Sequence, residues 1–221
     1  MPQNSLLCFG DSLTWGWVPR NPPVPSERFP PEVRWTGVLA DRLGEDYLVI
    51  EEGLSGRTTT ADDPTDPRLN GSAYLPAALA SHLPLDLVLL MLGTNDTKAS
   101  FGRTPFDIAM GMSILVGQVL ASAGGVGTAY PAPKVLVVAP PPLAPIPDPW
   151  FDLVYGGGHE KSTQLAGLYR SLASFHDVAF FDAGSVIATR GVDGVHFDEQ
   201  NNLDLGVALA AEVSRILRPR D

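Results

Sequence analysis

The sequence predicts an α/β protein built around a five-stranded parallel sheet, and two observations indicate this fold class. Short apolar runs alternate with longer stretches of helical periodicity, which is the pattern of successive strand-helix-strand units. Polar and glycine-containing motifs follow several of the apolar runs, where the strands of such a sheet would end. With 221 residues, 44% hydrophobic content and no serine-rich or charge-rich linker, the chain is expected to form one domain, residues 1–221.

The strands and helices are assigned in chain order from these patterns. The predicted strands are Leu6–Phe9, Tyr47–Glu51, Leu87–Leu92, Val135–Ala139 and Val178–Phe181. The predicted helices are Trp35–Leu43, Ala73–His82, Pro105–Ala121, His159–Phe175 and Asn201–Leu217. The first and last of these helices carry an apolar residue every three or four positions, so each is expected to pack one face on the sheet.

Two proline-rich stretches, Pro19–Pro31 and Ala139–Pro149, interrupt this order. Proline has no N–H and a nearly fixed φ, so both stretches are expected to be stiff loops rather than helices or central strands. They are either plain surface loops or the walls of a pocket or subunit contact, and the sequence leaves these alternatives open.

Charge and composition limit the possible partners and locations. The chain has 15 basic and 25 acidic residues, a net charge of −10, which repels nucleic acid and anionic lipid. Cys8 is the only cysteine, so no internal disulfide can form. The first four residues carry no basic leader, and no apolar run is long enough to cross a bilayer. We therefore expect a cytoplasmic protein that binds neither nucleic acid nor membrane.

Four short motifs follow the ends of predicted strands. Because parallel strands end at a common edge of the sheet, these motifs are expected to form one site. They are Gly10-Asp11-Ser12-Leu13, Leu54-Ser55-Gly56-Arg57, Gly93-Thr94-Asn95-Asp96 and Asp193-Gly194-Val195-His196.

Ser12 is the candidate nucleophile of this site. It follows the first strand at a sharp turn, where its hydroxyl can be exposed while its own N–H faces the same space. Gly56 offers a second backbone N–H, and Asn95 offers a side-chain amide, as acyl transfer through a serine requires. Each donor has a plain alternative, since Gly56 can simply adopt a positive φ and Asn95 can cap a helix.

A serine nucleophile needs a base, and the sequence contains four histidines. His82 and His176 precede strands and are expected at the opposite edge of the sheet, whereas His159 has no carboxylate placed to orient it. His196 follows the fifth strand, and Asp193 stands three residues before it. Asp193 can bind one imidazole nitrogen and leave the other to accept the proton of Ser12.

The four motifs, in this order, resemble the conserved blocks of the SGNH hydrolases, also called GDSL hydrolases. The resemblance implies a three-layer flavodoxin-like fold, with Ser12 as nucleophile, His196 as base and Asp193 as the residue that orients the base. It further implies an oxyanion hole made by the N–H groups of Ser12 and Gly56 with the amide of Asn95. The implied chemistry uses no metal and no cofactor.

Most of the chain resembles the arylesterase and acyltransferase members of this family, including residues 15–19, 63–71 and 149–151. This resemblance implies an acyl-enzyme formed from short-chain esters, which passes its acyl group to water, alcohols or peroxide. It also implies a homo-oligomer, an octamer in one family member. The expected substrate-binding residues are Leu13, Trp17, Thr94, Lys98, Phe151 and Val195, although core positions and, for Lys98, a solvated helix face are the plain alternatives.

Other interpretations remain open at this point. Ser55 is a rival nucleophile, because Gly53-Leu54-Ser55-Gly56 approximates the Gly-x-Ser-x-Gly elbow of other hydrolases. A metal-dependent phosphoesterase could use the acidic residues of the motifs with the histidine. A non-catalytic flavodoxin-like binding module is less favoured, because no glycine-rich phosphate motif is present. The phosphoesterase ligands would be Asp11, Asp96, Asp193 and His196.

Overall fold

The computed structural model describes residues 4–218 and contains one five-stranded parallel sheet. The strands lie in the order β2-β1-β3-β4-β5, which confirms the predicted fold class. Neighbouring strands are all parallel, with Gly10 of β1 beside Gly53 of β2 and Met91 of β3. The strand bounds are Asn4–Gly10 (β1), Tyr47–Gly53 (β2), Leu87–Met91 (β3), Lys134–Ala139 (β4) and Ala179–Asp182 (β5).

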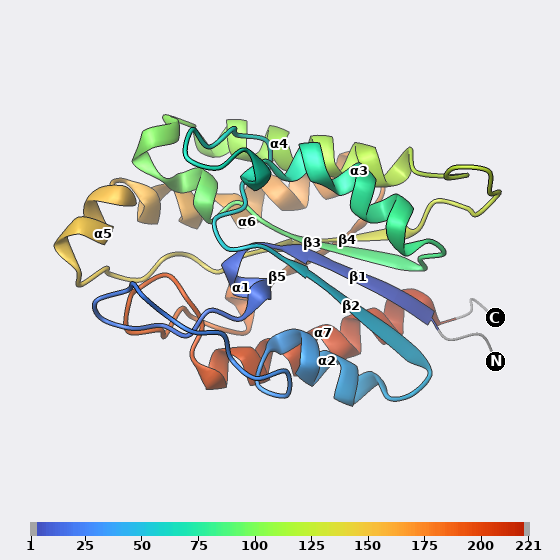
Figure 1. Ribbon diagram of the computed structural model, residues 1–221, viewed down its shortest axis with the longest axis horizontal. Coiled ribbons are helices and arrows are strands. Elements are labelled where there is room, and N and C mark those ends of the chain that lie inside the picture. The colour runs from blue at the N-terminus through green and yellow to red at the C-terminus, as the bar shows by residue number, and fades with distance from the viewer. Residues whose placement is uncertain (1–3, 219–221) are drawn as a thin grey trace.

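Helices cover both faces of the sheet, so the molecule has three layers (Figure 1). One face carries α3 (Gly71–His82), α4 (Pro105–Leu120) and α6 (Gly158–Phe175), and the other carries α2 (Trp35–Leu43) and α7 (Glu199–Leu217). Successive residues of β1 point to opposite layers: Leu7 and Phe9 pack with α3, α4 and α6, whereas Leu6 and Cys8 pack with α2 and α7. Burial on both faces explains why the strands appear as continuous apolar runs.

Two helices near the sheet edge were not assigned from the sequence. The short α1 (Ser12–Trp15) starts directly after β1, and α5 (Pro149–Val154) follows the second proline-rich stretch. The Asp148 side chain accepts a hydrogen bond from the Phe151 N–H and so caps the start of α5. The five predicted helices all form, with ends that differ from the prediction by no more than two residues.

The carboxyl ends of the strands lead into the loops that hold the four sequence motifs. Three of these loops follow the adjacent strands β2, β1 and β3, and the fourth precedes α7. The sheet therefore brings together segments that lie far apart in the sequence. Residues 1–3, on which the expected lack of a leader partly depends, lie outside the described residues. Within residues 4–218, no helix is long and apolar enough to cross a membrane.

Candidate active site

Ser12 stands at the first position of α1, immediately after β1. The Asp11 carboxylate accepts a hydrogen bond from the Leu13 N–H at 2.9 Å, which caps this helix and fixes the turn. The Ser12 hydroxyl oxygen lies 2.9 Å from Nε2 of His196, although the two residues are 184 positions apart. The fold thus brings the candidate nucleophile and base into hydrogen-bond contact.

Asp193 holds His196 from the opposite side of its ring. Its Oδ2 atom lies 2.7 Å from Nδ1 of His196, and its Oδ1 atom accepts the N–H groups of Val195 and His196. Residues 193–196 thus form a turn that the Asp193 carboxylate closes. Burial alone would raise the pKa of Asp193, but its hydrogen bonds with His196 and Val195 and the His196 charge outweigh burial and lower that pKa.

Gly194 allows the Asp193-to-His196 turn to pack against the second proline-rich loop. Its φ is 78°, and a Cβ here would lie 2.5 Å from the carbonyl oxygen of Pro145. Its own carbonyl accepts a hydrogen bond from the Ala144 N–H at 2.9 Å. The turn that carries the candidate base is therefore tied to the loop leading to α5.

Trp17 covers the imidazole of His196. The two rings stack with centroids 5.3 Å apart and an interplanar angle of 20°. Trp17 forms a β-bridge with Arg28, and the Val18 N–H donates to the Glu27 carbonyl, so the first proline-rich stretch folds back on itself. This loop holds the indole in place against the candidate base.

The three predicted oxyanion donors come from the loops after β1, β2 and β3. The backbone N–H groups of Ser12 and Gly56 donate no hydrogen bond to any of the described residues. Gly56 has a φ of 89° and lies in a turn closed by the hydrogen bond from the Arg57 N–H to the Leu54 carbonyl. Ser12, Gly56 and Asn95 line the same cavity, as an oxyanion hole requires.

The Asn95 amide is held by three partners. Its Nδ2 donates to the Arg57 carbonyl at 3.1 Å and approaches Oδ2 of Asp11 at 3.3 Å. Its Oδ1 accepts the hydroxyl hydrogen of Tyr155 at 3.3 Å. The side chain is buried, so these contacts define how the amide faces the cavity.

Arg57 connects the ends of three strands, a role that the sequence motifs did not indicate. Its buried guanidinium donates to the Gly10 carbonyl at 2.8 Å and to the Glu52 carbonyl, and it lies 4.2 Å from the ring centre of Phe9. Its own carbonyl accepts from Asn95. Arg57 therefore joins the end of β1, the end of β2 and the loop after β3.

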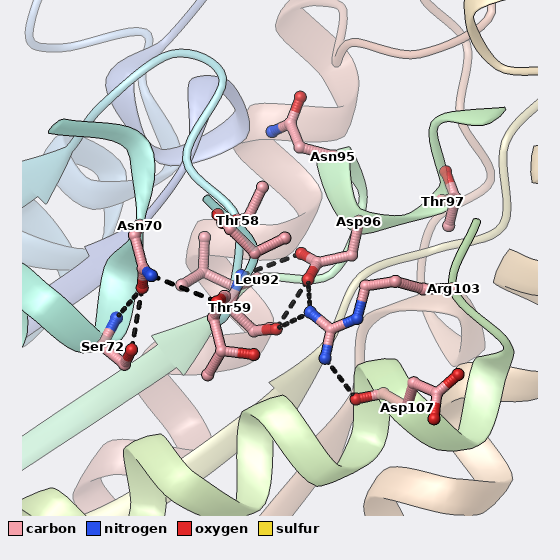
Figure 2. A network of polar contacts seen from close by, with 12 residues as sticks. Thr58, Thr59, Asn70, Ser72, Leu92, Asn95, Asp96, Thr97, Arg103 and Asp107 are labelled. Carbon is pink, nitrogen blue, oxygen red and sulfur yellow. Dashed lines mark hydrogen bonds and ion pairs between the residues drawn. The ribbon is translucent and has the colours of Figure 1, made fainter. Parts of the chain in front are cut away.

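A buried polar network joins the loop that carries Gly56 to the loop that carries Asn95 (Figure 2). The Asp96 carboxylate accepts the N–H and hydroxyl of Thr59 at 2.9 and 2.6 Å, and Arg103 donates to the same carboxylate at 2.5 Å. Arg103 also donates to the Asp107 carbonyl at the start of α4. These contacts fix the relative positions of two of the candidate oxyanion donors.

Asp11 is fully buried beside the candidate oxyanion hole. Burial raises its pKa to about 7; the Leu13 N–H, Arg57 and Lys98 oppose this shift, and the charge of Asp96 adds to it. Its ordinary pKa is 3.8, so between about pH 4 and pH 7 the folded state binds more protons than the unfolded state. Stability contributed by protonated Asp11 is therefore lost as the pH rises through this window.

We expect Asp11→Asn to become more stable relative to the parent protein as the pH rises from 5 to 8. The asparagine keeps an oxygen for the Leu13 N–H but carries no charge, and the relative gain should be about 2 kcal/mol. Urea unfolding of both proteins at pH 5 and pH 8 measures it. A stability difference that does not change with pH would show that Asp11 is already charged at pH 5.

The cavity beside Ser12 has a volume of about 290 Å³. The predicted binding residues Trp17, Lys98 and Phe151 line it, and so do Ser55 and three residues that sequence reasoning missed: Val24, Val154 and Tyr155. Val24 comes from the first proline-rich stretch, which therefore forms part of a pocket wall. A larger cavity of about 420 Å³ is lined by Arg57 and by none of the predicted catalytic residues.

Leu13, Thr94 and Val195 do not line the cavity beside Ser12, although the sequence placed them among the substrate-binding residues. Leu13 packs in the core with α2 and α7, and its carbonyl accepts the indole N–H of Trp35. Val195 packs with Leu143 and Tyr155, and the Thr94 carbonyl accepts the Thr97 hydroxyl. Each of these residues is next in sequence to Ser12, Asn95 or His196 but is itself buried.

Lys98 lines the cavity rather than lying on a solvated helix face. Its ammonium nitrogen lies 5.9 Å from the ring centre of Tyr155. Burial lowers its pKa, and the nearby carboxylates of Asp63, Asp11 and Asp96 partly offset that effect. Lys98 thus places its amine beside the site.

The other histidines have different partners. His82 contacts Glu52, His176 contacts the Ser113 hydroxyl, and His159 contacts the Leu143 carbonyl. The rival nucleophile Ser55 has a buried hydroxyl with no hydrogen-bond partner among the described residues. Ser12, by contrast, contacts an imidazole, which favours it as the nucleophile.

The four side chains considered as metal ligands do not form a metal site. Asp96 is bound by Thr59 and Arg103, and Asp193 is bound by His196. Within residues 4–218, no group of three or more His, Cys, Asp or Glu side chains is arranged to hold a metal ion.

Comparisons with known proteins identify the family of this chain and several relatives. Residues 8–202 match the model of the GDSL-like Lipase/Acylhydrolase family. The aryl esterase of M. smegmatis is 70% identical, with 97% of this chain and 100% of that chain covered and a TM-score of 0.96. Est24, a carbohydrate acetylesterase from Sinorhizobium meliloti, is 64% identical over the same shares, with a TM-score of 0.97.

A putative arylesterase from Agrobacterium tumefaciens is 41% identical, with 97% of this chain and 100% of that chain covered and a TM-score of 0.84. No match was found among curated proteins. The family match covers most of the chain, and the relatives share its fold over nearly their whole length. The chain therefore belongs to the GDSL-like lipase/acylhydrolase family, a family of ester hydrolases.

Proposed function

We propose that the protein is a serine esterase and acyltransferase that acts on short-chain esters through an acyl-enzyme on Ser12. The observation that carries this proposal is the unbroken set of contacts from the Ser12 hydroxyl to His196, at 2.9 Å, and from His196 to Asp193, at 2.7 Å. Two free backbone N–H groups and a side-chain amide adjoin it. The proposed chemistry needs no metal and no cofactor.

Acylation begins when Nε2 of His196 takes the proton of Ser12 as the serine oxygen attacks the ester carbonyl carbon. Asp193 stabilises the imidazolium that forms. The carbonyl oxygen becomes an oxyanion and receives hydrogen bonds from the N–H groups of Ser12 and Gly56 and from the Asn95 amide. When the intermediate collapses, the bond to the leaving alcohol breaks and His196 returns the proton to that oxygen.

Deacylation repeats these steps with a new acceptor. His196 takes a proton from water, an alcohol or hydrogen peroxide as the acceptor oxygen attacks the acyl carbon. The bond between the acyl carbon and the Ser12 oxygen then breaks, and His196 returns the proton to the Ser12 hydroxyl. Apolar side chains line much of the cavity, which limits the water near the acyl-enzyme and helps other acceptors to compete. Trp17, Val24, Phe151 and Val154 form this apolar wall.

The size of the cavity supports small acyl groups. Its volume of about 290 Å³ is just below the usual range of ligand pockets, roughly 300–1,000 Å³. Two relatives are described as an aryl esterase and a carbohydrate acetylesterase, and both descriptions fit hydrolysis of small esters. We propose acetates and similarly short esters as the substrate class.

Incubation with vinyl acetate and a primary alcohol in water tests the transfer part of this proposal. We expect the alcohol's acetate ester to form beside free acetate and its share to rise with alcohol concentration, because both acceptors attack the same acyl-enzyme. Gas chromatography measures both products, with Ser12→Ala as the blank. If acetate alone appears at every alcohol concentration, the protein is an esterase without acyltransferase activity.

The proposed homo-oligomer and cytoplasmic location stay predictions. Val24 lines the cavity, and Trp150 and Leu153 lie on α5, which also carries the cavity residues Phe151 and Val154. Their exposure supports a subunit contact on this side of the molecule. Their exposed fractions are 61% for Val24, 74% for Trp150 and 68% for Leu153.

A further inference from the structure

Tyr155 occupies a position that the proposed reaction does not yet explain. It follows α5, is only 5% exposed, and lines the cavity beside Ser12. Its hydroxyl lies 3.3 Å from Oδ1 of Asn95 and is the hydrogen-bond donor in this contact. The hydroxyl therefore touches the one candidate oxyanion donor that belongs to a side chain.

An asparagine amide can turn over by rotation about its last bond, which exchanges oxygen and nitrogen. In the present orientation, Nδ2 of Asn95 faces the Arg57 carbonyl and the Asp11 carboxylate, while Oδ1 faces Tyr155. Arg57 and Asp11 act only on the nitrogen side. A flipped amide would place Oδ1 against the Arg57 carbonyl and the Asp11 carboxylate, so these two acceptors and the Tyr155 hydroxyl all favour the present orientation. Tyr155 is the described partner that binds the oxygen, and its loss weakens this hold on the amide.

The surroundings of Tyr155 keep its hydroxyl protonated, so that it can donate a hydrogen bond. Burial raises its pKa far above the ordinary value, and the negative charges of Asp11 and Asp193 raise it further. The hydroxyl thus keeps its hydrogen at any pH at which the enzyme would work. Phe151 contacts the Tyr155 ring edge-on, with ring centres 5.1 Å apart, and holds the ring in place.

We infer that Tyr155 is a positioning residue that acts through Asn95: its hydroxyl, together with the Arg57 carbonyl, holds the amide in the orientation from which Nδ2 can donate to the oxyanion in place of its 3.3 Å contact with Asp11. This inference rests on the proposed function, because it assigns a role within the oxyanion hole proposed above. It adds a residue from the loop between α5 and α6 to a site whose other donors follow β1, β2 and β3.

Tyr155→Phe tests the inference because it removes the hydroxyl and keeps the ring that lines the cavity. We expect kcat for a short-chain aryl ester to fall about 5- to 10-fold, since one hydrogen bond of ordinary strength is lost. KM should stay nearly unchanged, because the oxyanion forms only in the transition state.

Tyr169→Phe is the matched control. Tyr169 is also buried, and its hydroxyl donates to the Leu92 carbonyl at 3.0 Å rather than to Asn95. Both variants lose one buried hydroxyl and should lose similar thermal stability, but only Tyr155→Phe should lose kcat. An equal loss of kcat in both would assign Tyr155 a merely structural role and overturn the inference.

The Asn95→Ala background provides the decisive comparison. If Tyr155 acts through the amide, Tyr155→Phe should have no further effect on kcat once the amide is absent. A full additional 5- to 10-fold loss in this background would contradict the inference, as would unchanged kcat in the single variant. Ser12→Ala, measured in parallel, separates the two proposals: if it retains turnover, the proposed function itself fails.

Discussion

Replacing Ser12 by alanine is expected to lower kcat for ester hydrolysis by about 10⁴- to 10⁶-fold, because no other described hydroxyl contacts His196. Residual catalysis would come only from the oxyanion donors acting on a water molecule. Steady-state hydrolysis of a short-chain aryl ester measures the effect, and circular dichroism shows whether the variant is folded.

Ser55→Ala is the matched control for this experiment. Ser55 lines the same cavity as Ser12, but its hydroxyl has no base beside it. The Ser55 variant should therefore remain an active enzyme. The opposite result, with Ser12→Ala active and Ser55→Ala inactive, would identify Ser55, in the loop after β2, as the nucleophile.

Asn95→Ala is expected to lower kcat by about 10²- to 10³-fold with little change in KM. Loss of one preorganised oxyanion donor removes stabilisation that exists only in the transition state. Acylation and deacylation both pass through an oxyanion, so stopped-flow measurements should show both rates reduced.

Asn95 also binds the Arg57 carbonyl, so thermal unfolding must be measured beside the kinetics. A variant that stays folded, keeps kcat and shows only a raised KM would place Asn95 in substrate binding instead of the oxyanion hole.

The strands could be predicted because this sheet is buried on both faces. Leu6 and Leu7 of β1 pack in different layers, so consecutive residues must all be apolar and the strand is obvious in the sequence. The helix α5 was missed because the preceding proline run indicated a loop. Its start depends on the Asp148 cap, a local contact that hydrophobic periodicity does not show.

Prediction of the site depended on where residues lie along the sheet edge. Ser12, Asp193 and His196 follow strands within short motifs, so their meeting could be inferred from topology. The roles of Arg57 and Tyr155 could not be predicted, because their partners are 47 and 60 residues away in the sequence. These partners are a backbone carbonyl and a side-chain amide, which leave no pattern in the sequence.

The expected substrate-binding residues show the same limit. Residues in or next to a motif can face either the cavity or the core, and sequence proximity does not decide between them. Trp17 faces the cavity because its loop folds back over His196, whereas Leu13 points into the core from the first turn of α1. The direction of a side chain at a sharp turn depends on packing between distant segments.

Covalent labelling with a fluorophosphonate, followed by peptide mass spectrometry, tests the central claim most directly. Such a reagent bonds to a serine only when a neighbouring base activates the hydroxyl and the oxyanion hole accepts the phosphoryl oxygen. We predict a single adduct on the peptide that contains Ser12, strongly slowed in His196→Ala. An adduct on Ser55, or no adduct in a protein that still hydrolyses esters, would contradict the account.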